Sequence, residues 1–154
     1  MKDIVVLNRE DVDSFWKLRF DLLKELGEIC SDINLIELEQ STKGFFLSSI
    51  NKNLICYGVV ENNEIISIVS LCLFDRIPYP ENLKGKEGYI LNVYTCPGFR
   101  RQGLAKLLLQ EIIIYANNHN INKLWLNSSE YGKCLYSSLG FICKNDEMVL
   151  MLKN

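Results

Sequence analysis

A short stretch with a glycine and several basic side chains joins an apolar, strand-like segment to an apolar, helix-like one. It spans residues 97–106 and reads PGFRRQGLAK. The first turn of an α-helix leaves main-chain N–H groups without acceptors, and the helix dipole favours negative charge at that end. Gly103 and Ala105 keep the predicted helix start bare, so an anion can approach the main chain. Three basic residues lie at the same end: Arg100, Arg101 and Lys106.

Two interpretations of residues 97–106 follow from the spacing alone. Cations at a helix N-terminus oppose the dipole, and a bound anion would offset that cost. The other interpretation is an ordinary helix start with solvated arginines. The stretch contains neither G-x-x-x-x-G-K-S/T nor G-x-G-x-x-G, so it is neither a nucleoside-triphosphate loop nor a dinucleotide-binding turn.

The stretch also resembles a family signature. Residues 100–105 read R-x-x-G-x-A, similar to the acetyl-CoA signature Q/R-x-x-G-x-G/A of the GNAT superfamily of N-acetyltransferases. Residues 135–141 read L-Y-x-x-x-G-F and resemble a second segment of that family. The two segments occur in the family's order, with one predicted strand between them. The motif match covers about residues 88–141, and the predicted order of elements resembles the family over nearly the whole chain.

The resemblance implies acetyl-CoA as the co-substrate. Main-chain amides of residues 101–106 would hold its diphosphate, and its pantetheine arm would lie where the preceding strand splays from the next. A main-chain N–H near Val93 would polarise the thioester carbonyl, as an oxyanion donor does. The implied cofactor-binding residues are Leu91, Asn92, Val93 and Tyr94 on the strand, and Arg100, Arg101, Gln102, Gly103, Leu104, Ala105 and Lys106 at the helix start.

The resemblance further implies that Tyr136 is the general acid that protonates the departing CoA thiolate. Without the flanking family residues, a tyrosine beside an apolar helical stripe would be a packing residue. An acceptor amine is protonated near pH 7, so a base must take its proton. Glu87 is a candidate base on the strand that enters the site, and the alternative is an exposed carboxylate at the strand edge.

Three other positions carry open alternatives. Asn127 or Ser129 replaces a CoA-contacting asparagine of the family, or serves only as a helix cap. Arg19 interrupts the apolar stripe of the first helix, and it either faces the acceptor pocket or extends to solvent. The family resemblance implies that this pocket lies between the first two helices and the loop at residues 76–88.

Hydrophobic periodicity supplies the elements that position these residues. It predicts four helices, at residues 11–26, 35–51, 101–118 and 130–139. It predicts strands at residues 54–60, 64–74, 87–95 and 121–127, and one or two terminal strands within residues 141–152. The fold class is α/β: a mixed, mostly antiparallel central sheet with helices on both faces. Residues 87–127 form its splayed parallel βαβ unit, and residues 1–154 form a single domain.

Composition excludes several other classes of protein. The formal net charge of −2 argues against a nucleic-acid partner. No uncharged apolar stretch reaches the roughly 18 residues that a membrane span needs. One histidine, and six cysteines without a C-x-x-C pair, argue against a metal site and predict free thiols in the cytoplasm. Ile113, on an otherwise polar helix face, leaves a homodimer possible.

The predicted function is transfer of the acetyl group of acetyl-CoA to a primary amine of a small molecule or peptide. The amine would attack the thioester directly in a ternary complex. The alternative is a non-catalytic acyl-CoA-binding or regulatory module on the same fold. Release of the CoA thiol in the presence of amines distinguishes the two.

Overall fold

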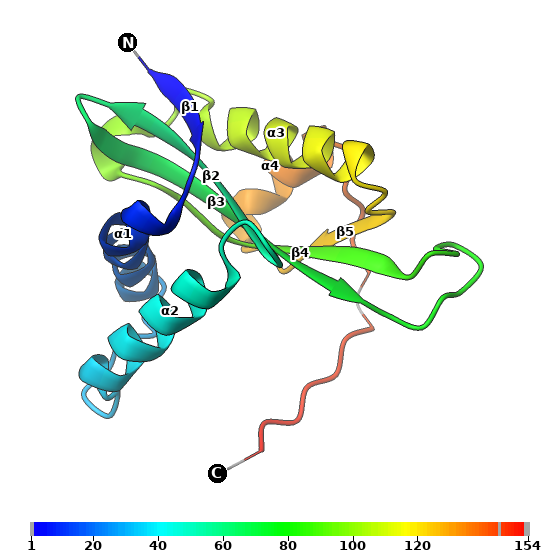
Figure 1. Ribbon diagram of the computed structural model, residues 1–154, viewed down its shortest axis with the longest axis horizontal. Helices are drawn as coiled ribbons and strands as arrows, with labels where there is room; N and C mark the ends of the chain where they lie inside the picture. The colour runs from blue at the N-terminus through cyan, green and yellow to red at the C-terminus, as the bar shows by residue number, and fades with distance from the viewer. Residues whose placement is uncertain (1, 145, 153–154) are drawn as a thin grey trace.

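A five-stranded sheet with strand order β1-β2-β3-β4-β5 forms the centre of the molecule (Figure 1). The computed structural model describes residues 2–144 and 146–152. The first four strands pair in antiparallel fashion and the last pair is parallel, which confirms the predicted mixed sheet. The strands are β1 (Asp3–Val6), β2 (Leu54–Glu61), β3 (Glu64–Asp75), β4 (Lys86–Thr95) and β5 (Lys123–Leu126).

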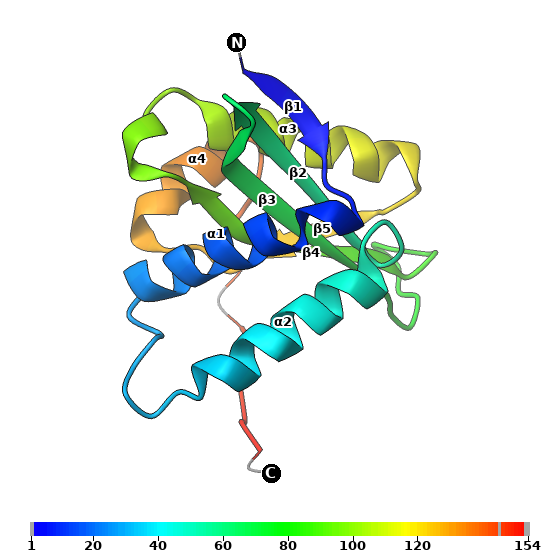
Figure 2. The same ribbon diagram turned by 60° about the vertical axis from the view of Figure 1, so that its left-hand side comes forward.

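Helices cover both faces of the sheet, as the sequence predicts (Figure 2). Helices α1 (Val12–Glu25) and α2 (Leu35–Ser49) pack on one face around a core that includes Phe15 and Phe46, whose ring centroids are 4.6 Å apart. Helix α3 (Leu104–Asn118) packs on the other face, and α4 (Lys133–Ser138) joins that core. Three short 3₁₀ helices complete the described elements: η1 (Arg9–Asp11), η2 (Pro97–Phe99) and η3 (Glu130–Gly132).

A β-bulge interrupts the pairing of β4 with β3. Tyr94 pairs with Ile68 and Leu91 pairs with Ser70, so β4 has one more residue than β3 between these two pairs. Asn92 lies at this point with a φ of 57°, a left-handed conformation that asparagine tolerates better than most residues. The bulge breaks the alternation of the strand, and as a result the neighbours Leu91 and Asn92 both line the same cavity.

Strands β4 and β5 diverge halfway along β4. Their parallel pairing runs from Glu87 opposite Lys123 to Ile90 opposite Leu126, where β5 ends. Strand β4 continues to Thr95 with β3 as its only partner strand among the described residues. The edge of residues 91–95 that faces away from β3 is therefore open, which is the splay that the sequence predicts.

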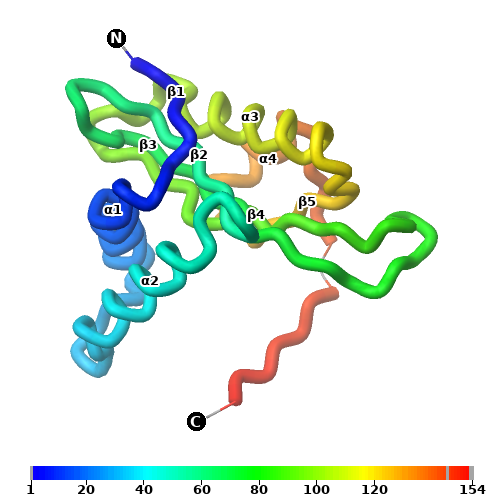
Figure 3. The backbone as a smooth tube through the Cα atoms, viewed as in Figure 1, coloured from blue at the N-terminus to red at the C-terminus, as the bar shows by residue number. Residues whose placement is uncertain are grey.

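The predicted terminal strands are wrong for the described part of the tail. Residues 141–144 and 146–152 form no strand, and the tail runs away from the sheet (Figure 3). Residue 145 lies outside the described residues. Five neighbouring apolar side chains of the tail are largely exposed because no strand edge pairs with their backbone: Met148, Val149, Leu150, Met151 and Leu152.

Gly88 allows β4 to pack between β3 and β5. A Cβ atom at this position would lie 2.6 Å from Leu71 Cδ1 and 3.0 Å from Leu124 Cδ2. Because Leu71 is fully buried, we expect Gly88→Ala to lower the free energy of unfolding by about 1–3 kcal/mol through overpacking. Urea denaturation measures the change. Gly98→Ala is the control, since no atom lies within 4 Å of its Cβ position, and we expect a change within about 0.5 kcal/mol.

Candidate active site

The start of α3 presents a set of free main-chain donors. Arg101 and Gly103 adopt left-handed conformations with φ of 62° and 76°, so α3 begins at Leu104 and not at Arg101 as predicted. Leu107 N–H donates to Gly103 O at 3.0 Å, but no described residue accepts from the N–H groups of residues 101–106. The first turn also lacks an acidic side chain. These amides suit the diphosphate of a co-substrate, because each N–H group can donate a hydrogen bond and has no acceptor among the described residues.

The basic side chains at this end are not equivalent. Arg100 makes a bidentate ion pair with Glu25 at 2.8 and 2.7 Å, and its Nε donates to Thr95 O at 2.8 Å. Its positive charge is therefore compensated by α1, and a contact of Arg100 with the co-substrate stays a prediction. Arg101 and Lys106 are exposed and have no ion pair within the described ranges. They remain the two cations available at the helix start.

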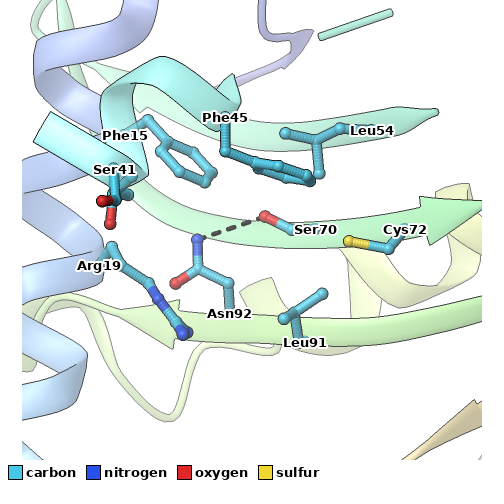
Figure 4. Close-up of a pocket in the computed structure, with 10 residues that line it drawn as sticks. Phe15, Arg19, Ser41, Phe45, Leu54, Ser70, Cys72, Leu91 and Asn92 are labelled. Atoms are coloured by element: carbon cyan, nitrogen blue, oxygen red, sulfur yellow. Dashed lines mark hydrogen bonds between the residues drawn. The ribbon is translucent and has the colours of Figure 1, made fainter. Parts of the chain in front are cut away.

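A cavity of about 240 Å³ lies between α1, α2 and the sheet (Figure 4). It reaches β4 at the bulge, through Leu91 and Asn92. The open edge of β4 leads from the same residues towards the start of α3, so the cavity and the free amides connect along one strand. One wall is apolar and consists of Phe15, Phe45, Leu54 and Leu91; the other lining residues are Arg19, Ser41, Thr42, Ser70, Cys72 and Asn92.

Tyr136 lies on α4, which follows β5, the other arm of the splay. Its ring packs against the α3 side of the core and lies edge-on to Phe141 at 6.0 Å. Gly132 makes room for this ring, since a Cβ there would lie 2.8 Å from Tyr136 Cε2. Burial raises the pKa of the Tyr136 hydroxyl, so the group keeps its proton at neutral pH. No described residue hydrogen-bonds to this hydroxyl.

The model of the acetyltransferase (GNAT) family matches residues 16–141. The chain belongs to the GNAT acetyltransferase family. A search of curated protein sequences finds no match.

Solved structures of similar fold support the family membership. A Clostridium acetobutylicum protein described as a predicted acetyltransferase, solved with acetyl-CoA, superposes with a TM-score of 0.89 at 27% identity over 98% of this chain and 96% of that one. A GCN5-related N-acetyltransferase from Ralstonia eutropha JMP134 gives a TM-score of 0.86 at 19% identity, with coverage of 98% and 99%. The second similarity shows the fold alone.

Within this GNAT fold, Glu87 lies in an unexpected environment. Its carboxylate is fully buried and accepts hydrogen bonds from Tyr79 Oη at 2.9 Å and from Arg76 Nη1 at 3.3 and 3.4 Å. The alternative of an exposed strand-edge carboxylate is therefore wrong. Glu87 does not line the cavity of Figure 4. Its role as general base stays a prediction, and these contacts favour a structural role.

Glu87→Gln separates the two roles. We expect the free energy of unfolding to fall by about 1–3 kcal/mol, because Arg76 and Tyr79 lose a charged acceptor. We expect kcat to stay within about threefold, whereas removal of a general base costs about 100-fold or more. Chemical denaturation and steady-state kinetics of acetyl transfer measure both quantities. A fall of kcat by two orders of magnitude in a stably folded variant would instead identify Glu87 as the base.

The structure places the other positions predicted from the sequence in different surroundings. The Ser129 hydroxyl accepts from Gly132 N–H at 3.3 Å and caps η3, one of the two alternatives drawn from the sequence. Asn127 lies beside the hydroxyl of Tyr89, and a contact with CoA stays a prediction for both residues. Arg19 lines the cavity. The loop at residues 76–88 does not contribute to that cavity, although sequence reasoning placed it there.

Sequence reasoning missed the side chains that α2 and β3 supply to the cavity. Ser41, Thr42 and Phe45 come from α2, whose periodicity is weak around Gly44. Cys72 comes from β3, where a cysteine in an apolar run has no distinguishing signal. Burial raises the pKa of the Cys72 thiol, which disfavours a nucleophilic thiolate. In the part of the chain that the structure describes, no cluster of three or more residues of metal-ligand type occurs, and no helix is long and apolar enough to cross a membrane.

Proposed function

We propose that the chain transfers the acetyl group of acetyl-CoA to a primary amine of a small molecule or peptide, by direct attack in a ternary complex. The observation that carries this proposal is the open edge of β4, which links the free amides of α3 to the cavity at the bulge. Membership of the GNAT family and the acetyl-CoA in the clostridial structure support the identity of the acyl donor.

The donor-binding half of the site acts mainly through the main chain. The amides of residues 101–106 hold the diphosphate, assisted by the side chains of Arg101 and Lys106. The open edge formed by Leu91, Asn92, Val93 and Tyr94 binds the amides of the pantetheine arm. A main-chain N–H near Val93 stabilises the negative charge that develops on the thioester oxygen. Acetyl-CoA supplies the activated acyl group.

The acceptor-binding half lies on the α1 and α2 side of the sheet. The cavity holds the amine next to the bulge, so that its nitrogen reaches the thioester carbonyl from the acceptor side. The C–N bond forms as the C–S bond breaks. The ammonium group loses one proton to solvent water before attack and a second one after it, while Tyr136 donates its proton to the leaving thiolate and is reprotonated from solvent. Burial raises the pKa of Tyr136, so the phenol carries the proton that it would donate at neutral pH.

A thiol-release assay with acetyl-CoA and a panel of primary amines tests this function. We expect calorimetry to show acetyl-CoA binding, and at least one amine to release CoA thiol faster than water alone. Binding without release by any amine would support the alternative, a non-catalytic acyl-CoA-binding module. Absence of binding would overturn both.

A further inference from the structure

Arg19 differs from the other cations of α1 because it has no partner. Lys17 and Lys24 lie 3.3 and 3.8 Å from the carboxylate of Asp21. Arg19 points into the cavity (Figure 4) and makes neither an ion pair nor a hydrogen bond with a described residue. Burial lowers the pKa of its guanidinium, and the exposed Glu28 opposes this only at longer range. An unpaired guanidinium kept in a partly apolar cavity is costly unless a ligand compensates it.

Asn92 supplies a second group without a partner in the same cavity. Its side chain is 5% exposed, and its Nδ2 donates to Ser70 Oγ at 3.2 Å. Its Oδ1 is buried and accepts no hydrogen bond from any described residue. Figure 4 shows this oxygen turned away from Ser70, on the side of Arg19. A buried carbonyl oxygen without a donor is destabilising, so this oxygen indicates a ligand that carries an N–H group.

The two groups together describe a ligand with an anion and an N–H donor. We propose that the acceptor is a small amine that carries a carboxylate, with the carboxylate bound by Arg19 and the amine nitrogen held by Asn92 Oδ1. The planar guanidinium matches a carboxylate in bidentate geometry. Among the described residues that line this cavity, Arg19 is the only cation, so one negative charge balances it, and a doubly charged phosphate would not. Phe15 and Phe45 provide an apolar wall for the body of the molecule.

This inference rests on the proposed acetyl transfer and names its substrate class. The amine nitrogen bonds to the acetyl carbon and the C–S bond breaks. One proton leaves the nitrogen and one joins the sulfur, which gives an N-acetylated carboxylate and free CoA. The position of Asn92 at the bulge favours this course, because the residue that holds the nitrogen adjoins the strand edge that holds the thioester.

Matched pairs of amines test the role of the carboxylate. The pairs are leucine with 3-methylbutylamine, and 5-aminopentanoate with pentylamine; the members of each pair share the body and differ in the carboxylate. For at least one pair, we expect Arg19→Met to lower kcat/KM for the carboxylated amine by about 10- to 100-fold, mainly through KM. For the amine without a carboxylate we expect a change within about threefold, since no bond to Arg19 is lost.

Two further variants serve as controls. Arg19→Lys keeps the charge and loses the bidentate geometry, so it should retain part of the preference for the carboxylate. Lys17→Met removes an exposed cation from the same helix, outside the cavity, and should leave both amines of each pair unaffected. Thermal melting of each variant establishes that it is folded.

The outcomes separate this inference from the proposed function. If Arg19→Met lowers kcat/KM equally for both members of each pair, or if wild type prefers the amines without a carboxylate, acetyl transfer stands and the carboxylate site is wrong. If no amine releases thiol, the carboxylate site is tested by binding instead. Calorimetry then measures the affinity for N-acetylleucine of wild type and of Arg19→Met, each in the presence of CoA. Binding to wild type about tenfold or more tighter than to Arg19→Met supports the carboxylate site without transfer. Equal binding overturns both.

Discussion

Replacing Ala105 with aspartate is expected to weaken acetyl-CoA binding by about 10- to 100-fold while making the fold more stable. The two effects have opposite signs for one physical reason. A carboxylate in the first turn of α3 accepts hydrogen bonds from the free amides and interacts favourably with the helix dipole, which adds about 0.3–1 kcal/mol to the free energy of unfolding. The same carboxylate occupies the donors and repels the diphosphate.

Calorimetric titration of acetyl-CoA and thermal melting measure the two effects. Ala105→Asn is the control, because it has nearly the same shape as aspartate without the charge, and its affinity for acetyl-CoA should fall less. An aspartate variant that binds acetyl-CoA as tightly as wild type would place the diphosphate elsewhere and remove the start of α3 from the site.

Tyr136→Phe is expected to lower kcat by about 10- to 1,000-fold, with little change in acetyl-CoA binding. The variant loses the proton that the departing thiolate needs, but it keeps the ring that packs against Phe141. The hydroxyl has no described partner in the protein, so the free energy of unfolding should change by no more than about 0.5 kcal/mol. Steady-state kinetics with a saturating amine measures the loss.

The pH dependence of kcat gives an independent readout for Tyr136. Burial raises the pKa of this hydroxyl, so wild type should keep its proton donor up to a pH above about 10, and lose activity beyond it. The phenylalanine variant should lack that alkaline decline. Tyr131→Phe is the matched control on neighbouring η3: its side chain is 99% exposed, and the change should leave kcat intact. An undiminished kcat in Tyr136→Phe would exclude a general-acid role.

Hydrophobic periodicity predicts the helices and the central strands, although this signal is weak in α2 around Gly44. The start of α3 was misplaced by three residues, because Arg101 adopts a left-handed conformation that its residue type does not indicate. Gly103 was the only local signal of that turn. The free amides arise from this turn, so the motif predicts where an anion would bind but does not predict the backbone geometry there.

Elements that form only by pairing with another strand cannot be predicted from their own residues. Strand β1 is four residues long and forms by pairing with the edge of β2, so it was not predicted. Residues 141–144 and 146–152 of the tail have a strand-like composition but pair with no strand edge, so the strand prediction is wrong there. The bulge at Asn92 depends on the register between β4 and β3. As a result, the asparagine side chain was not recognised as part of the cavity.

The bulge in β4 lies where main-chain groups of the open edge meet the side chains of the cavity. Residues 91–94 offer their main chain at the open edge, whereas most of the side chains that line the cavity come from α1, α2 and β3. Main-chain amides are the same whatever the residue, so we expect most substitutions at residues 91–94 to leave the proposed binding of the pantetheine arm unchanged. Over evolutionary time, exchanges on α1 and α2 can therefore redirect such a scaffold to new acceptors, while its acyl source is inherited unchanged.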